Sequence, residues 1–228
     1  MKYSHLLFDL DGTLFDYDKA ESEALKNSFL QLDLPYDSAF LQIYRALNLQ
    51  IWQEFEKGNI SQKELKTKRF ANLSDSLKIE FDPQKFSDKY LLNLSKRTSL
   101  IEGCEDLLSQ LNGNTDLYLI TNGLTIVQNP RIRNSSIGHY FKGVIISEEV
   151  GFAKPHKEIF DIAFENMNNP DKDKVLIIGD SLSSDIAGGI NYGIDTCWYN
   201  PKDNELDQDF KPTYQIKELK EIFTLIQN

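Results

Sequence analysis

Apolar runs of strand length recur along the chain. They cover residues 4–8, 116–120, 143–147, 174–178 and 194–198, and helical patterns separate the later ones. Continuous apolar strands with helices between them are typical of a parallel sheet that is buried on both faces. The pattern therefore predicts an α/β fold whose parallel sheet has helices on both faces.

The first two runs are separated by about a hundred residues that contain no comparable strand. Within residues 17–96 the apolar positions recur with a helical period instead. Ser61 and Glu64 have the spacing of a capping box, and Asp82 before Pro83 suits the N-cap and first position of a helix. These signals predict four helices inserted directly after the first strand.

The insert divides the chain into two parts. We expect residues 1–16 and 97–228 to form the core that contains the sheet, and residues 17–96 to form a helical cap domain. One more helix, around residues 104–111, should lead into the second strand. With 228 residues, the chain is long enough for a core of this size and a modest insert.

The net charge limits the kinds of partner. The formal charge is −10 at pH 7, whereas proteins that bind nucleic-acid polymers depend on lysines and arginines that displace counterions. We therefore expect no nucleic-acid polymer as a partner. An anionic substrate would need a local cation to overcome the negative field of the protein.

The cysteines and the N-terminus bear on the location of the protein. Cys104 and Cys197 are the only cysteines, and their spacing favours neither a disulfide framework nor a zinc site. The N-terminal apolar run is interrupted by Asp9, so it is too short for a secretory signal or a membrane span. We therefore expect a cytoplasmic protein with no membrane partner.

Polar residues follow four of the predicted strands. The carboxyl ends of parallel strands meet at one edge of an open sheet, and ligands bind there. The residues in question are Asp9 and Asp11 after the first strand, Thr121, Asn122 and Gly123 after the second, Lys154 in the loop after the third, and Asp180, Ser181 and Asp185 after the fourth. We expect these side chains to lie close together.

These groups suit a divalent cation and a phosphoryl group. Carboxylate oxygens are the ligands that Mg²⁺ prefers, and no cluster of histidine and cysteine suggests zinc. Asp9 could act as a nucleophile that forms an aspartyl-phosphate, while Asp11 could protonate the leaving oxygen and later activate water. The metal and Lys154 would neutralise negative charge, and the Thr121 hydroxyl with nearby amides would bind phosphoryl oxygens.

Four segments, DLDGT, TNG, AKP and GDSLSSD, occur in this order. Together they resemble the four motifs of the haloacid dehalogenase-like hydrolase superfamily, and the match spans the whole core. The resemblance implies a Rossmann-like core with a helical cap inserted after the first strand. It also implies roles for the matching residues: Asp9 as nucleophile and metal ligand, Asp11 as acid and base with its backbone oxygen on Mg²⁺, Thr121, Asn122 and Lys154 at the phosphate, and Asp180 and Asp185 at the metal.

Longer segments, among them ISEEVGFAKPHKEIFDIAFE and TNGLTIVQNPRIRNS, look like the branch of non-canonical pyrimidine nucleotidases. This resemblance implies a 5'-nucleotidase that acts on nucleoside monophosphates such as UMP, dUMP and dTMP. A phosphatase of sugar phosphates or other small esters, or a phosphomutase, would use the same motifs. A haloacid dehalogenase would dispense with Asp11 and the metal, and a phospho-accepting signalling module would lack so large an insert.

Residues outside the motifs have more than one interpretation. Tyr44, Trp52 and Phe55 recur at near-helical spacing, which favours the core of a helical bundle over stacking on a nucleobase. Arg131 and Arg133 are expected to lie at the surface or to anchor a loop rather than to bind substrate.

Overall fold

The computed structural model describes residues 2–206 and 209–227. Among them, six strands form one parallel sheet in the order β3-β2-β1-β4-β5-β6. Five strands coincide with the predicted apolar runs, and the sixth was not predicted. The strands are β1 (His5–Phe8), β2 (Asp116–Thr121), β3 (Gly143–Ile146), β4 (Val175–Gly179), β5 (Asp195–Tyr199) and β6 (Tyr214–Ile216).

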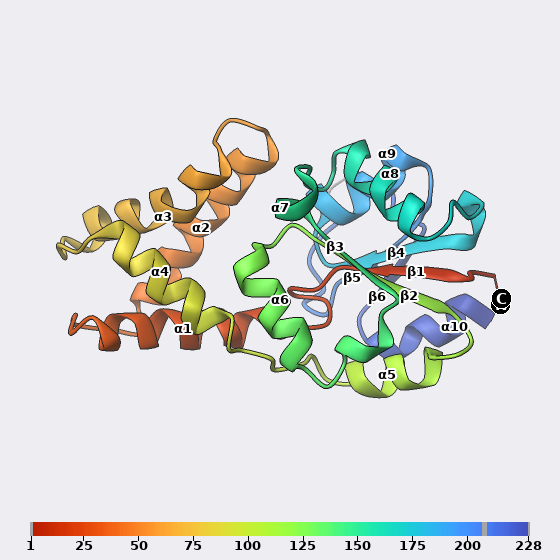
Figure 1. The fold of residues 1–228 in the computed structure, drawn as a ribbon, viewed down its shortest axis with the longest axis horizontal. Helices are drawn as coiled ribbons and strands as arrows, with labels where there is room; N and C mark the ends of the chain where they lie inside the picture. The colour runs from red at the N-terminus through yellow and green to blue at the C-terminus, as the bar shows by residue number, and fades with distance from the viewer. Residues whose placement is uncertain (1, 207–208, 228) are drawn as a thin grey trace.

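Helices cover both faces of the sheet, as predicted (Figure 1). Successive residues of a strand point to opposite faces. Accordingly, Leu6 and Phe8 pack in a cluster with α5 and α10, while Leu7 packs in a second cluster with α8 and α9. The elements of this part are α5 (Cys104–Leu111), α6 (Thr125–Asn134), η1 (Gly138–Tyr140), α7 (Ser147–Val150), α8 (Lys157–Asn166), η2 (Lys172–Lys174), η3 (Leu182–Ile186), α9 (Ala187–Tyr192), η4 (Leu219–Glu221) and α10 (Ile222–Gln227).

The strand order places β1 and β4 side by side at the centre of the sheet. From β1 the chain continues to β2 and β3 on one side, whereas β4, β5 and β6 extend the sheet on the other side. The loops after β1 and β4 therefore diverge, and such a switch point leaves a crevice at the carboxyl edge. Asp9 and Asp180 follow these two strands directly.

The predicted four-helix insert is present and occupies the left side of Figure 1. Ser61 and Glu64 form the capping box at the start of α3, and Asp82 accepts hydrogen bonds from two backbone N–H groups at the start of α4. Tyr44 is fully buried in the core of the insert and stacks on Phe70, so its predicted place in the bundle is confirmed. The helices are α1 (Tyr17–Gln31), α2 (Phe40–Glu56), α3 (Gln62–Leu77) and α4 (Pro83–Leu94).

Polar contacts join the insert to α7 and η3, the short helical segments that follow β3 and β4 at the carboxyl edge of the sheet. The Lys66 ammonium of α3 lies 2.7 Å from Glu148, and the Ser183 hydroxyl donates to Glu56 of α2 at 3.2 Å. The insert therefore lies over the edge at which the predicted site residues gather. Within the described part of the chain, no helix combines the length and the apolar character that crossing a membrane requires.

Candidate active site

The Lys154 ammonium lies at the centre of the site. It donates to Asp9 Oδ1 at 2.6 Å, to Asp185 Oδ1 at 2.7 Å and to the Ile120 carbonyl at 2.7 Å. The Lys154 side chain is 1% exposed, so these bonds lie away from bulk water. All three N–H donors are in use, and Lys154 could bind a phosphoryl oxygen only by releasing one of them.

The loop that carries Lys154 is held by Asn122, at the end of β2. The Asn122 side chain donates to the Lys154 carbonyl at 2.8 Å and accepts from the Lys154 N–H at 2.7 Å. The amide of Asn122 is therefore committed to the backbone of Lys154. The predicted contact of Asn122 with phosphate stays a prediction, and it is left to the main-chain N–H or to the second hydrogen of the side-chain amide nitrogen.

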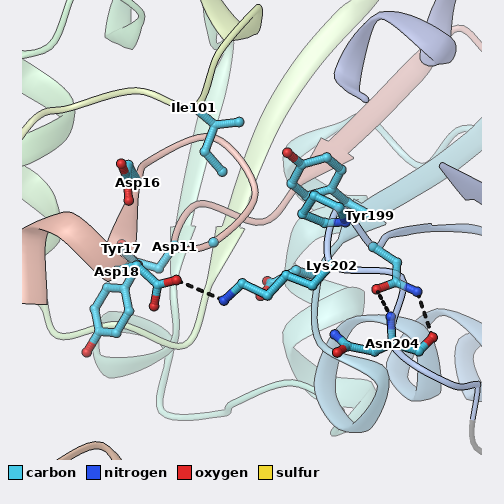
Figure 2. A pocket seen from close by; sticks show the side chains of 12 residues that line it. Asp11, Asp16, Tyr17, Asp18, Ile101, Tyr199, Lys202 and Asn204 are labelled. Atoms are coloured by element: carbon cyan, nitrogen blue, oxygen red, sulfur yellow. Dashed lines mark hydrogen bonds and ion pairs between the residues drawn. The ribbon is translucent and has the colours of Figure 1, made fainter. Parts of the chain in front are cut away.

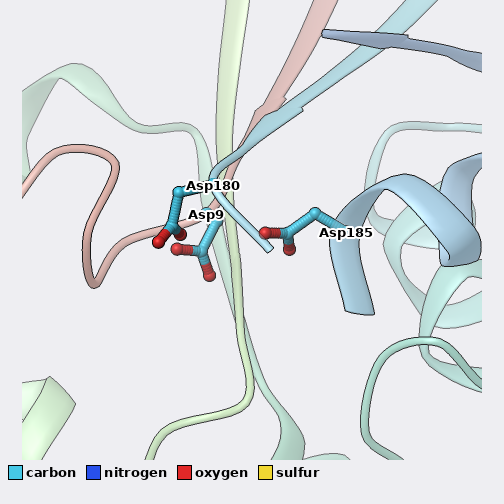
Figure 3. Close-up of side chains that lie close together, drawn as sticks. All are labelled: Asp9, Asp180 and Asp185. Atoms are coloured by element: carbon cyan, nitrogen blue, oxygen red, sulfur yellow. The ribbon is translucent and has the colours of Figure 1, made fainter. Parts of the chain in front are cut away.

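Three carboxylates gather beside Lys154, where Figure 3 shows Asp9, Asp180 and Asp185 converging from the ends of β1 and β4 and from the segment after β4. Each offers an oxygen, and these oxygens lie within 4.8 Å of one another. The Thr13 hydroxyl donates to Asp180 at 3.3 Å, and the Ser181 N–H donates to Asp185 at 3.0 Å.

Two glycines make this close approach possible. At Gly12, whose φ of +89° is left-handed, a Cβ atom would lie 2.5 Å from Asp180 Oδ2. At Gly179, a Cβ atom would lie 2.2 Å from Asp185 Oδ2. Any larger residue at either position would push a carboxylate out of the cluster.

The electrostatics of the cluster follow from burial and crowding. Burial raises the pKa of Asp9 well above its ordinary value, the Lys154 charge opposes this effect, and the carboxylates of Asp185 and Asp180 add to it. Loss of hydrating water in the site, together with the charge of Asp185, raises the pKa of Asp180 to about 7. Burial lowers the pKa of Lys154, but Asp185 and Asp9 more than compensate, so its net shift is upward and the ammonium stays charged.

The donor set fits a divalent cation. Three carboxylates and one ammonium group carry a formal charge of −3 + 1 = −2, which one divalent ion would neutralise. The side-chain atoms that could bind a metal ion here are all carboxylate oxygens. Hard cations such as Mg²⁺ prefer oxygen ligands. The residues that could hold such an ion are Asp9, Asp180 and Asp185.

Asp11 lies beside this cluster, but its carboxylate is engaged elsewhere. It contacts Gln128 and Arg131 of α6, and it lines the same cavity as Asp9. The predicted contact of Asp11 with the metal through its backbone oxygen stays a prediction. Arg131 was expected at the surface or as the anchor of a loop, and the second alternative holds: it is fully buried and donates to the Arg97 carbonyl at 2.8 Å.

Thr121 ends β2 and lines this cavity. The hydroxyl accepts from the Gly123 N–H at 3.1 Å and from the Gln128 side-chain amide at 3.2 Å. The sequence pattern missed Gln128 and Arg131 as neighbours of Asp11. Their spacing of three residues on α6, which places them one helical turn apart on one face, was the available signal.

A cavity of about 350 Å³ opens above the carboxylates and below the insert. Its floor contains Asp9, Thr121 and Lys154, and its roof comes from α1 and α2. The roof residues are Tyr17, Asp18, Glu21, Arg45, Asn48, Leu49, Trp52 and Glu56. The cavity is thus large enough for a small organic molecule and has both a charged and an apolar wall.

A smaller cavity of about 240 Å³ borders the first one (Figure 2). It lies between the start of α1 and the loop after β5, and it shares four lining residues with the larger cavity, namely Asp11, Tyr17, Asp18 and Asp180. The Lys202 ammonium lies 2.8 Å from Asp18 across this cavity. The ion pair ties the first turn of the insert to the core.

Comparisons with known proteins agree on one family. The family model of haloacid dehalogenase-like hydrolases matches residues 6–199. Pyrimidine 5'-nucleotidase YjjG of Escherichia coli is 35% identical over 99% of both chains, and pyrimidine 5'-nucleotidase PynA of Streptococcus pneumoniae is 37% identical over 95% of this chain and 92% of its own. The HAD-hydrolase YfnB of Bacillus subtilis, in a magnesium-bound crystal structure, is 36% identical with a TM-score of 0.95 over 100% of both chains.

Proposed function

The chain belongs to the haloacid dehalogenase-like hydrolase family, and we propose that it is a magnesium-dependent phosphomonoesterase that removes the 5'-phosphate from pyrimidine nucleoside monophosphates. The observation that carries this proposal is the pairing of Asp9 with the buried Lys154 ammonium, in a carboxylate cluster at the floor of a cavity. This arrangement supplies a nucleophile, a fixed cation and a place for a divalent ion beside one another.

Asp9 is the proposed nucleophile. Its Oδ1 accepts from Lys154, and among the described residues no hydrogen bond occupies its Oδ2. Oδ2 attacks phosphorus, the bond from phosphorus to the ester oxygen breaks, and an aspartyl-phosphate forms. Lys154 keeps Asp9 oriented during this step and offsets the negative charge that accumulates around it.

Asp11 moves the protons in this mechanism. It donates a proton to the departing ester oxygen, so the nucleoside leaves as a neutral alcohol. As a carboxylate, Asp11 then takes a proton from the water that attacks the aspartyl-phosphate. Inorganic phosphate departs, and Asp9 is restored as a free carboxylate.

Asp9, Asp180 and Asp185 are the proposed side-chain ligands of Mg²⁺, with the backbone oxygen of Asp11 as a further ligand. When bound, the ion supplies positive charge that balances the carboxylates and the phosphoryl oxygens. Thr121 and the main-chain N–H groups after β2 are the proposed phosphate contacts, and Lys154 joins them if it releases one of its present partners.

Residues 17–96 serve as the proposed cap domain over a core of residues 1–16 and 97–228. The roof of the cavity places Trp52 and the 60% exposed Leu49 side by side with acidic residues. An uncharged pyrimidine base can pack on Trp52 and Leu49. A second phosphate would meet the Glu56 carboxylate, while the carboxylates of Asp18 and Glu21 are paired with Arg45. The names of YjjG and PynA also support a pyrimidine nucleoside monophosphate as the substrate.

A phosphate-release assay tests the proposed function. The purified protein is given nucleoside 5'-monophosphates, nucleoside 3'-monophosphates and sugar phosphates, with Mg²⁺ or with EDTA. We expect release to be concentrated on UMP, dUMP and dTMP and to fall at least about 100-fold in EDTA, because the carboxylate cluster would keep its uncompensated charge.

The other results of this assay have distinct meanings. Phosphate release from sugar phosphates alone would agree with the proposed role of Asp9 as nucleophile, and it would contradict the proposal that the substrate is a nucleotide. Release that is unchanged in EDTA would contradict the metal site, and no release from any ester would contradict the phosphatase itself.

Trp52 gives a sharper test of base recognition. We expect Trp52→Ala to raise KM for UMP about tenfold while leaving kcat within about threefold, because aromatic stacking on a base contributes about 1–3 kcal/mol. Ribose 5-phosphate, which has no base, serves as the control substrate, and its KM should stay within about twofold. An equal rise of KM for both substrates would show that Trp52 does not recognise the base.

A further inference from the structure

Two side chains of α6 hold both carboxylate oxygens of Asp11. The Gln128 side-chain amide donates to Oδ2 at 2.7 Å, and Arg131 Nη1 donates to Oδ1 at 2.5 Å. A carboxylate held at both oxygens by different donors cannot rotate freely about its last bond. Each oxygen keeps a second lone pair, so Asp11 can still exchange a proton toward the cavity.

The two donors also hold each other. Arg131 Nη1 donates to Gln128 Oε1 at 3.0 Å, and Gln128 is only 1% exposed. A Cβ atom at residue 123 would lie 2.1 Å from the Gln128 amide nitrogen, so the glycine found there leaves room for this side chain. We call Gln128 and Arg131 together the Asp11 clamp.

The clamp also reaches both segments that join the core to the insert. Arg131 Nε donates to the Arg97 carbonyl at 2.8 Å in the returning segment, and its guanidinium lies 4.6 Å from the centre of the Phe15 ring in the departing segment. Arg131 is fully buried, and its Nη2 has no partner among the described residues. Burying an arginine with an unused donor lowers the free energy of unfolding, which points to a role for Arg131 in the site.

We propose that Gln128 and Arg131 are positioning residues that orient the Asp11 carboxylate for proton transfer to the leaving oxygen. This inference rests on the proposed function, because it assumes that Asp11 protonates an ester oxygen. Neither residue lines the cavity, so both act on the substrate only through Asp11. Their contribution is to place the Asp11 proton on the cavity side, in line with the oxygen that departs from phosphorus.

Changing the leaving group of the substrate distinguishes positioning of Asp11 from a merely structural role of the two residues. A ribose oxygen leaves poorly as an anion and needs a proton, whereas p-nitrophenolate is stable and departs without one. Single-turnover experiments with enzyme in excess and Mg²⁺ present measure leaving-group release, and so report the first transfer alone. The variants are Gln128→Leu and Arg131→Met, and Arg133→Met is the matched control because Arg133 is exposed two residues further along α6.

For both clamp variants we expect uridine release from UMP to slow at least 30-fold, while p-nitrophenolate release stays within about threefold of wild type. The Arg133→Met protein should match wild type with both substrates. Equal slowing with both substrates, or slowing with neither, would overturn the proposal.

Two controls keep these results separable. Thermal unfolding checks that each variant folds, and Gln128→Leu carries the test if Arg131→Met does not fold. If wild-type protein releases no uridine from UMP, the proposed substrate fails, and the same comparison is then made with glucose 6-phosphate, whose leaving oxygen also needs a proton. Equal slowing of glucose release and p-nitrophenolate release in the clamp variants would overturn the proposal. Selective slowing of glucose release would support it.

Discussion

The Asp9→Asn protein is expected to lose turnover of phosphate esters by at least about 10⁴-fold, because a neutral amide cannot replace a carboxylate nucleophile. The substitution also reduces the formal charge of the cluster from −2 to −1 and so weakens its attraction for a divalent ion. The Asn side-chain oxygen can still accept a hydrogen bond from Lys154, so the fold should persist.

The measurement is phosphate release with UMP as substrate, together with mass spectrometry of the peptide that contains residue 9. Wild-type protein quenched in acid during turnover should carry a phosphoryl group on this peptide, and the Asn variant should not. Asp106→Asn changes an exposed carboxylate in the first turn of α5 and serves as the matched control. If Asp9→Asn keeps turnover within tenfold of wild type, Asp9 is not the nucleophile.

The Lys154→Met protein is expected to lose both activity and stability. Turnover should fall about 10³-fold, since the nucleophile loses the one cationic partner it has among the described residues and a preorganised charge is removed from the site. The substitution also leaves the buried carboxylates of Asp9 and Asp185 unpaired. Breaking a buried ion pair in this way typically costs about 3–5 kcal/mol of unfolding free energy.

The pH dependence of this stability loss has a definite sign. Lys154 holds the pKa of Asp9 down against the effect of burial, so without Lys154 this pKa rises further above the unfolded value of about 3.9. The folded variant then binds more protons than the unfolded chain at intermediate pH, so its stability falls as the pH rises. We therefore expect the loss relative to wild type to be smaller at pH 5 than at pH 7.5.

Chemical denaturation in EDTA at the two pH values measures this difference. Lys157→Met is the control, because Lys157 is a 68% exposed lysine of α8 that pairs with Asp161 on the surface. It should change the unfolding free energy by no more than about 0.5 kcal/mol and leave turnover unchanged. A stability loss in Lys154→Met that is the same at both pH values would contradict the assignment of Lys154 as the partner of these acids.

The insert and the five longer strands were predictable from the sequence for local reasons. A strand buried on both faces must be apolar along its length, and a helix of a bundle must repeat its apolar positions every three or four residues. Such patterns are visible within ten to fifteen residues. Strand β6 lacked this signal because it is three residues long and only Ile216 is fully buried in it.

The gathering of Asp9, Asp180 and Asp185 was also predictable, although these residues are far apart in sequence. One rule suffices for this prediction, since the carboxyl ends of parallel strands share an edge and β1 and β4 are neighbours. The rule locates a residue at the edge without specifying its hydrogen-bond partners.

Those partners were decided by the tertiary structure alone. Lys154 was expected at the phosphate, but its three donors are used by Asp9, Asp185 and the Ile120 carbonyl. Arg131 anchors a loop, which was one of its two expected roles, but its contact with Asp11, 120 residues earlier in the chain, was not predicted. The sequence by itself determined the fold, the edge of the sheet at which the site lies, and the residue types of the site. The pattern of apolar residues and the direction of the strands govern these features. Which donor meets which carboxylate depends on the packing of α6 and the Lys154 loop, and no local pattern encodes distances across the fold.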